Sequence, residues 1–326
     1  MELKGIHHVS AITGSASANV DFYTRVLGLR LVKKTVNQDD TSVYHLFYGD
    51  ERGNPGTELT FFELPRAQRQ REGRGSISAT SLRVADDESL QYWLRRLDEF
   101  GVERDEIVER AGRSTLAFRD PEGQRIILVS DERNEGVAGG TPWDRSTVPQ
   151  RYGITGLGPV QLTVASPTGS HLVLTDIMGY RQTGQYASHI AGQPDIVVYE
   201  TGEGGSGSEV HLEQRTDLRH EWQGIGGVHH VAFRVDDDEE LRKWTATISE
   251  AGLRNSGIID RFYFKSLYFR EPGGILYELA TDGPGFATDE PVEQLGESLA
   301  LPPFLEPQRA QIEARLKPIE AKFSTN

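Results

Sequence analysis

The chain contains no cysteine, and this absence limits its chemistry before any motif is considered. Without thiols there can be no disulfides, no thiolate zinc sites and no cysteine nucleophile. Any metal must therefore be held by histidine, aspartate or glutamate. Long apolar runs are also missing, since none approaches the ~18 residues that a membrane-spanning helix needs.

Positive charge is scarce as well. The 326 residues include 35 lysines and arginines against 49 acidic residues, which gives a net charge of −14. This balance argues against binding to nucleic acid or to anionic membranes. The first residues, Met1–Lys4, do not begin a signal peptide, so we expect a cytoplasmic protein. The length exceeds that of a typical single core and predicts two domains.

Four internal repeats, called modules one to four, organise most of the chain. Each contains an apolar strand, an amphipathic helix behind a polar cap, and a glycine that ends the helix. The glycines are separated by intervals of 73, 78 and 73 residues: Gly28, Gly101, Gly179 and Gly252. The helices of modules two and four have the clearest apolar spacing, in Leu90, Trp93 and Leu97 and in Leu241, Trp244 and Ile248.

Short β-type segments follow each helix, and a turn glycine precedes the last of them in every module. Each module therefore has the pattern βαβββ. A unit of this size cannot bury both faces of its own sheet, so modules should combine into curved sheets around a cavity. The predicted fold class is α+β, with four βαβββ modules in two domains and curved mixed sheets in each.

Composition suggests where the domains divide. We expect residues 1–138, with modules one and two, to form an N-terminal domain, and residues 153–290, with modules three and four, to form a C-terminal domain. The Gly- and Pro-containing segment 139–152 is the predicted linker. Residues 291–326 form a predicted extension whose helix begins near Glu306, with these residues on one face: Ile312, Leu316 and Ile319.

Two histidine pairs stand at the same point of the first strand in modules one and four. They are His7-His8 and His229-His230. Neighbouring residues of a strand face opposite sides of the sheet, so we expect one histidine of each pair to point into the cavity. The pattern does not tell which one. Without a metal, both pairs would simply be polar residues of a repeated strand motif.

Glu278 separates these two interpretations. It lies in the apolar strand Leu276–Leu279, where a carboxylate is costly unless it is paired or bound to a metal. Six residues after the corresponding turn proline, modules one and two have Phe61 and Ile127 instead. Two imidazoles and one carboxylate form the open triad of non-haem Fe(II) oxygenases. Modules one and four should then be adjacent, which leaves modules two and three to pair in the other half.

Together these features resemble the vicinal oxygen chelate superfamily, which includes glyoxalases, bleomycin-resistance proteins and extradiol dioxygenases. Within it, the chain is similar to ring-cleaving dioxygenases that act on para-hydroquinones. The resemblance covers nearly the whole chain. Besides the histidine pairs, it rests on these segments: Tyr44–Tyr48, Asn54–Thr57, Asp260–Arg261, Tyr263–Phe264, Ser266–Tyr268, Gly273–Glu278, Gly285–Phe286 and Leu301–Pro307.

The resemblance also implies roles for individual residues. The implied metal ligands are His8, His230 and Glu278. The implied catalytic residues are His7, His229, Arg261 and Tyr268, and the implied substrate-binding residues are Ser10, Arg261 and Tyr268. A second-sphere histidine of near-neutral pKa would move a phenolic proton, while Arg261 would stabilise a developing oxyanion. Without the resemblance, the alternative for Arg261 is an ion pair with Asp260 at the surface, and the alternative for Tyr268 is an aromatic residue of the cavity wall.

The expected function is an Fe(II)-dependent dioxygenase that inserts both atoms of O₂ into a hydroquinone-type diol, with Mn(II) as the second choice of metal. Three protein ligands leave up to three positions open for the diol and O₂, the expected partners. The sequence leaves homo-oligomer formation open. The alternatives are a catechol-type extradiol dioxygenase, a metal-free small-molecule binding protein, and a glyoxalase-like isomerase or lyase with a fourth ligand such as Glu58, Glu213 or His211.

Overall fold

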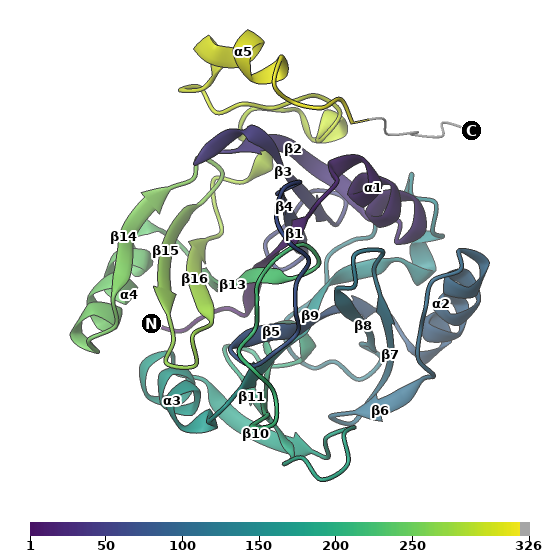
Figure 1. The fold of residues 1–326 in the computed structure, drawn as a ribbon, viewed down its shortest axis with the longest axis vertical. Coiled ribbons are helices and arrows are strands. Elements are labelled where there is room, and N and C mark those ends of the chain that lie inside the picture. Colours follow the sequence, from purple (N-terminus) through teal and green to yellow (C-terminus); the bar gives the residue numbers. More distant parts are fainter. Residues whose placement is uncertain (320–326) are drawn as a thin grey trace.

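The computed structural model describes residues 1–319, and its strands form two eight-stranded sheets (Figure 1). The first sheet contains all strands of modules one and four, in the order β14 (Asn255–Asp260), β15 (Lys265–Arg270), β16 (Leu276–Thr281), β13 (Val228–Val235), β1 (Ile6–Thr13), β4 (Glu58–Glu63), β3 (Asp40–Gly49) and β2 (Arg30–Asn37). The second contains those of modules two and three, in the order β10 (Arg181–Tyr186), β11 (Ile196–Glu200), β12 (Val210–Gln214), β9 (Ile154–Val164), β5 (Ser76–Val84), β8 (Arg125–Ser130), β7 (Arg113–Arg119) and β6 (Val108–Arg110). The predicted fold class and the predicted pairing of modules are confirmed.

Modules join through their first strands. Within each module the first and last strands run parallel, whereas β1 pairs antiparallel with β13 and β5 pairs antiparallel with β9. The two histidine-bearing strands are therefore neighbours at the centre of the first sheet. Each sheet takes one module from residues 1–138 and one from residues 153–290, so the sheets cross the expected domain boundary. The division into two domains stays a prediction.

Helices lie outside the sheets (Figure 1). The longer ones are α1 (Ala16–Val20) continuing into η1 (Asp21–Val26), α2 (Asp87–Glu99), α3 (Pro167–Leu172) continuing into η3 (Val173–Ile177), and α4 (Asp238–Glu250). Single turns occur at η2 (Gln150–Tyr152), η4 (Ser206–Ser208), η5 (Phe286–Thr288), η6 (Val292–Gln294) and η7 (Glu306–Gln308). Within residues 1–319, no helix is long and apolar enough to cross a membrane.

Sequence signals account for the limits of the module helices. Asp86 caps α2 by accepting a hydrogen bond from the Ser89 amide, and Asp237 caps α4 in the same way. All four predicted stop glycines have a positive φ, between 65° and 76°. This left-handed conformation favours glycine because it lacks a Cβ. The apolar faces of these helices, including Trp93 and Trp244, are buried in the hydrophobic core.

The C-terminal extension is less helical than predicted. A turn begins at Glu306 as expected, but helix α5 covers only Arg309–Glu313. A further turn reaches Leu316, whose amide donates to the Ile312 carbonyl, and Pro318 prevents continuation beyond it, since it cannot donate a backbone hydrogen bond and disfavours a helical conformation in the residue before it. Ile312 and Leu316 are nevertheless buried, as their spacing predicts. The end of the expected extension, 320–326, lies outside the described residues.

Asp120, which follows β7, forms a hydrogen bond with Tyr23 in η1, and its burial should make the stability of the fold depend on pH. Its carboxylate accepts a hydrogen bond from the Tyr23 hydroxyl at 3.0 Å, and burial raises the pKa of Asp120 to about 6. The folded chain therefore binds a proton more tightly than the unfolded chain. This contribution to stability is complete below the unfolded pKa of about 3.9 and is lost as pH rises through 6.

We expect the free energy of unfolding of the wild type, relative to Asp120→Asn, to fall by about 2 kcal/mol between pH ~4.5 and ~7.5. Urea denaturation of both proteins at these two pH values measures the difference. A difference that is constant or that increases with pH would contradict this account of Asp120.

Candidate metal centre

Two β-bulges decide which histidine of each pair faces the cavity. In the antiparallel pairing of β1 with β13, the register skips His7 and His229, whereas His8 and His230 keep cross-strand partners. A bulge adds one unpaired residue to a strand and changes the direction of nearby side chains. The first histidine of each pair is the extra residue, and the second histidine keeps its place in the regular register.

Three ligand atoms meet at the centre of the first sheet. The Nε2 atoms of His8 and His230 are 3.2 Å apart, and Oε2 of Glu278 lies 3.1 Å from the first and 2.8 Å from the second. All three side chains are buried, and Glu278 is 0% exposed. Within residues 1–319, neither oxygen of Glu278 accepts a well-directed hydrogen bond. A buried carboxylate in this state is costly unless a cation binds to it.

The spacing of these atoms fits one face of an octahedral metal site. Bonds of about 2.1 Å at right angles place neighbouring ligand atoms about 3.0 Å apart, whereas tetrahedral angles place them about 3.4 Å apart. The separations of 2.8, 3.1 and 3.2 Å lie around the octahedral value. Two imidazoles and one carboxylate, with no sulfur, suit iron or manganese.

Charge at the triad is also appropriate for a cation. Burial opposes ionisation of Glu278, but the adjacent His8 and His230 hold its pKa well below the ordinary value. Burial lowers the pKa of His230, so its imidazole is neutral and has a lone pair to donate. With Glu278 ionised and His230 neutral, the site offers a cation one negative charge and an imidazole lone pair.

A hydrogen-bond chain orients His8. Nε2 of His7 lies 3.1 Å from the carbonyl oxygen of Thr281, and Nδ1 of His7 lies 3.0 Å from Nδ1 of His8. A carbonyl only accepts, so we assign the proton of His7 to Nε2 and leave its Nδ1 as an acceptor. His8 must then donate from Nδ1, which frees its Nε2 lone pair for a metal.

His229 has the same relation to His230, with their Nδ1 atoms 2.7 Å apart. Burial, followed by the neighbouring histidine, lowers the pKa of both His7 and His229 to about 3. The expectation of a near-neutral pKa is therefore wrong, because these imidazoles are desolvated. Neither residue lines the cavity beside the triad. Their positions suit orientation of the ligand histidines.

A cavity of about 50 Å³ adjoins His8 and His230. The three residues predicted to bind substrate all line it: Ser10, Arg261 and Tyr268. Arg261 forms an ion pair with Asp39 at 3.2 Å, instead of the surface pair with Asp260 weighed above. Its guanidinium lies 5.6 Å from the centre of the Tyr268 ring. Burial raises the pKa of Tyr268, so its hydroxyl stays protonated.

His45 also lines this cavity and was not singled out from the sequence as a site residue. Its ring lies 4.0 Å from the ring of Phe47 and 4.1 Å from that of Phe62, and its Nε2 is 3.1 Å from Oγ1 of Thr60. Burial lowers its pKa well below the ordinary value, so the ring is neutral. Strand alternation could have indicated it, because His45 and Phe47 lie two residues apart in β3 and share a face.

The register of the strands corrects the comparison of Glu278 with Phe61 that was made from the sequence. Ser10 and Ala232 each follow a ligand histidine by two residues, and they pair with Thr60 and Glu278 respectively. Thr60 is therefore the counterpart of Glu278 in module one, and Phe61 is not. The connection from the turn proline to β4 is one residue shorter than the connection to β16, which a fixed six-residue spacing cannot detect.

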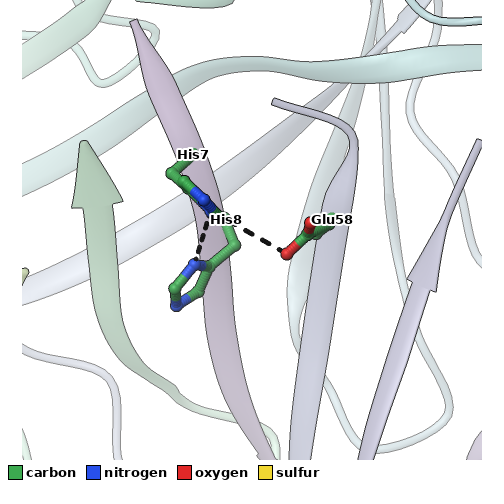
Figure 2. A group of neighbouring side chains, drawn as sticks. All are labelled: His7, His8 and Glu58. Atoms are coloured by element: carbon green, nitrogen blue, oxygen red, sulfur yellow. Dashed lines mark hydrogen bonds and ion pairs between the residues drawn. The ribbon is translucent and has the colours of Figure 1, made fainter. Parts of the chain in front are cut away.

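Glu58 does not complete a four-ligand site. Figure 2 shows it on β4 beside His7 and His8, with Oε2 3.8 Å from Nδ1 of His7. Burial raises the pKa of Glu58 well above its ordinary value, which favours the neutral acid. Among the described residues, it joins a cluster with His7 and His8 and does not join the triad. The other two candidates, Glu213 and His211, lie on β12 in the second sheet.

Paired βαβββ modules around a buried cluster of two histidines and one glutamate define a class of proteins in which two modules together form a candidate metal site. Residues 5–128 and 157–279 match the glyoxalase/bleomycin resistance protein/dioxygenase superfamily, and the chain belongs to this superfamily.

Three similar proteins extend this result. The chain is 54% identical to "Putative ring-cleaving dioxygenase MhqA" of Bacillus subtilis (strain 168), over 98% of this chain and all of that protein. It is 32% identical to the chlorohydroquinone/hydroquinone 1,2-dioxygenase of Sphingobium indicum, over 93% of each chain. A crystal structure described as a putative dioxygenase from Bacillus subtilis covers 98% of both chains, with a TM-score of 0.87 and 38% identity.

The geometry predicts different effects for the two histidines of one pair. His230→Ala removes one of three ligands and should abolish stoichiometric metal binding. His229→Ala removes only the hydrogen-bond partner of a ligand and should weaken metal affinity by roughly 10- to 100-fold. Metal analysis after anaerobic loading, followed by competition with a chelator, measures both. The reverse order of effects would show that the bulge assignment is wrong.

Proposed function

We propose that this protein is an Fe(II)-dependent dioxygenase that cleaves the ring of a hydroquinone-type diol and inserts both atoms of O₂. The observation that carries the proposal is the buried triad of His8, His230 and Glu278, spaced as one face of an octahedron beside a cavity. The names of the two relatives support ring cleavage, and one of them supports hydroquinone as the substrate. Mn(II) is the second choice of metal.

Three protein ligands favour this chemistry over isomerisation. When bound, Fe(II) supplies open adjacent positions for a phenolate oxygen and O₂ and allows electron transfer between them. A glyoxalase-like isomerase or lyase would need a fourth ligand, and the described residues offer none at the triad. In a metal-free binding protein, the fully buried Glu278 would depend, among the described residues, on the neighbouring His8 and His230 alone to offset the cost of its burial.

The cavity wall supplies groups that act on the substrate. Arg261 is proposed to bind and stabilise negative charge that develops on a substrate oxygen, because its guanidinium is permanently charged. Asp39 holds this guanidinium in place from the opposite hairpin, with a separation of 3.2 Å. The protonated hydroxyl of Tyr268 is proposed to position the ring by donating a hydrogen bond. Ser10 is proposed as a further substrate contact, fixed by Thr60 at 2.7 Å.

His45 is proposed to meet the second hydroxyl of the diol. It contributes a neutral imidazole to the cavity, and Thr60 already occupies its Nε2. Its Nδ1 is then available for a substrate hydroxyl away from the triad, which suits a para-diol better than a catechol bound through adjacent oxygens. His7 and His229 are proposed to orient the ligand histidines and to prevent their Nε2 atoms from being protonated.

Oxygen consumption tests the proposal. Anaerobically iron-loaded protein should consume one O₂ per hydroquinone, with a smaller kcat/KM for the matched catechol. Glu278→Gln should bind little iron and show no turnover. If loaded wild-type protein consumes no O₂ with any para- or ortho-diol, the proposed function fails. If only catechols react, the catechol-type alternative replaces it.

Tyr268 gives a sharper test of the cavity. Tyr268→Phe should lower kcat/KM by about a hundredfold, the scale for the loss of one preorganised donor. Tyr263→Phe is a matched control, because Tyr263 lines the same cavity but its hydroxyl donates to Asp289 at 2.8 Å. Iron content should be unchanged in both. Equal activity of the two variants would show that the Tyr268 hydroxyl takes no part in turnover.

A further inference from the structure

A second cavity, of about 120 Å³, lies against the sheet of modules two and three. Gln161 and Ala232 are equivalent positions of modules three and four, because each lies five residues before a helix cap. Gln161 pairs with His211, and Ala232 pairs with Glu278. His211 therefore takes the place of Glu278 in module three. Glu213, two residues further along β12, faces the same side and lines the cavity. The second sheet thus keeps a cavity on the face where the first sheet has its metal triad.

One oxygen of the Glu213 carboxylate, Oε1, has no hydrogen-bond partner among the described residues. Its Oε2 accepts hydrogen bonds from Thr163 at 2.7 Å and from Gln161 at 3.1 Å. Its Oε1 is buried without a hydrogen bond, and the nearest cation, on Arg215, is 3.9 Å away. The residue is only 3% exposed. A buried carboxylate oxygen in this state calls for a hydrogen-bond donor from a ligand.

Gln124 is a second incomplete group in the wall of the same cavity. It is 2% exposed, and neither its amide nitrogen nor its amide oxygen has a hydrogen-bond partner in the described part of the chain. A carboxamide can donate twice and accept twice, so a ligand with both oxygens and a donor would satisfy it. Buried polar side chains are rarely left without partners in folded proteins, and here two of them line one cavity.

The cavity wall contains three arginines besides the carboxylates Glu72 and Glu213: Arg119, Arg125 and Arg215. Each has a carboxylate near it, at 2.6 Å for Arg119 and Glu72, 3.7 Å for Arg125 and Asp105, and 2.7 Å for Arg215 and Asp217. A guanidinium has five N–H donors, so each arginine retains donors for a ligand anion.

We infer that this cavity binds a small carboxylate that carries a neighbouring hydrogen-bond donor. The hydroxyl or ammonium donor would bind Oε1 of Glu213, and the carboxylate would bind Arg125 or Arg215. The cavity has a volume of about 120 Å³ and opens to solvent, so a small acid can enter it. The site does not depend on the metal centre, and its wall is too polar for the ring of an aromatic diol.

Three four-carbon acids form a matched set for the test. L-Malate has a hydroxyl donor, L-aspartate has an ammonium donor, and succinate has neither. Calorimetric titration uses full-length Glu278→Gln protein, because a hydroxyacid could otherwise chelate the metal. Malate or aspartate should bind with 1:1 stoichiometry and about tenfold or more tighter than succinate. The stronger of the two identifies the donor.

Two variants in this Glu278→Gln background locate the binding. Glu213→Gln should remove the preference for a donor without weakening succinate, whereas Arg125→Gln should weaken all three acids. Thermal denaturation identifies a variant that fails to fold, and the two substitutions probe opposite ends of the ligand. The inference is overturned if the three acids bind equally, if none binds at roughly 10 mM, or if Glu213→Gln keeps the preference. Oxygen uptake is measured separately, so failure of the dioxygenase proposal would not be confused with this result.

Discussion

The antiparallel pairing of β1 with β13 is the constraint on which the rest of the site depends. It brings together His8 and His230, which are 222 positions apart in the chain, so that their Nε2 atoms are 3.2 Å apart. A bulge on each strand displaces the first histidine of each pair without losing the register of the second. Glu278 arrives on β16, the parallel neighbour of β13. The candidate metal site therefore needs residues from two modules, and one module alone cannot form it.

The hydrogen-bond chain that orients His8 begins at the backbone carbonyl of Thr281. Thr281 accepts from His7, His7 accepts from His8, and the Nε2 lone pair of His8 is thereby left for a metal. Thr281 lies three residues after Glu278 on the same strand. A shift of β16 would therefore disturb a ligand and the hydrogen bond that orients another ligand at the same time. Burial keeps the imidazole of His7 neutral, as this chain of hydrogen bonds requires.

The βαβββ module occurs in both sheets with different residues at equivalent positions. Both sheets have the same arrangement of parallel and antiparallel strands, and each has a cavity. The position of Glu278 is taken by Thr60 in module one and by His211 in module three. The first sheet thus has a His-His-Glu triad, whereas the second has a polar cavity with no such triad among the described residues, although the strand pattern is the same.

Local patterns in the sequence were sufficient for the modules, their helices and the stop glycines, because caps, apolar spacing and left-handed turns depend on nearby residues. Repetition also identified the two histidine pairs and Glu278 as exceptional. Tertiary structure alone decided the bulges and the correspondence of Glu278 with Thr60 rather than Phe61. The near-neutral pKa expected for His7 failed for the same reason, since desolvation arises only when distant strands pack together.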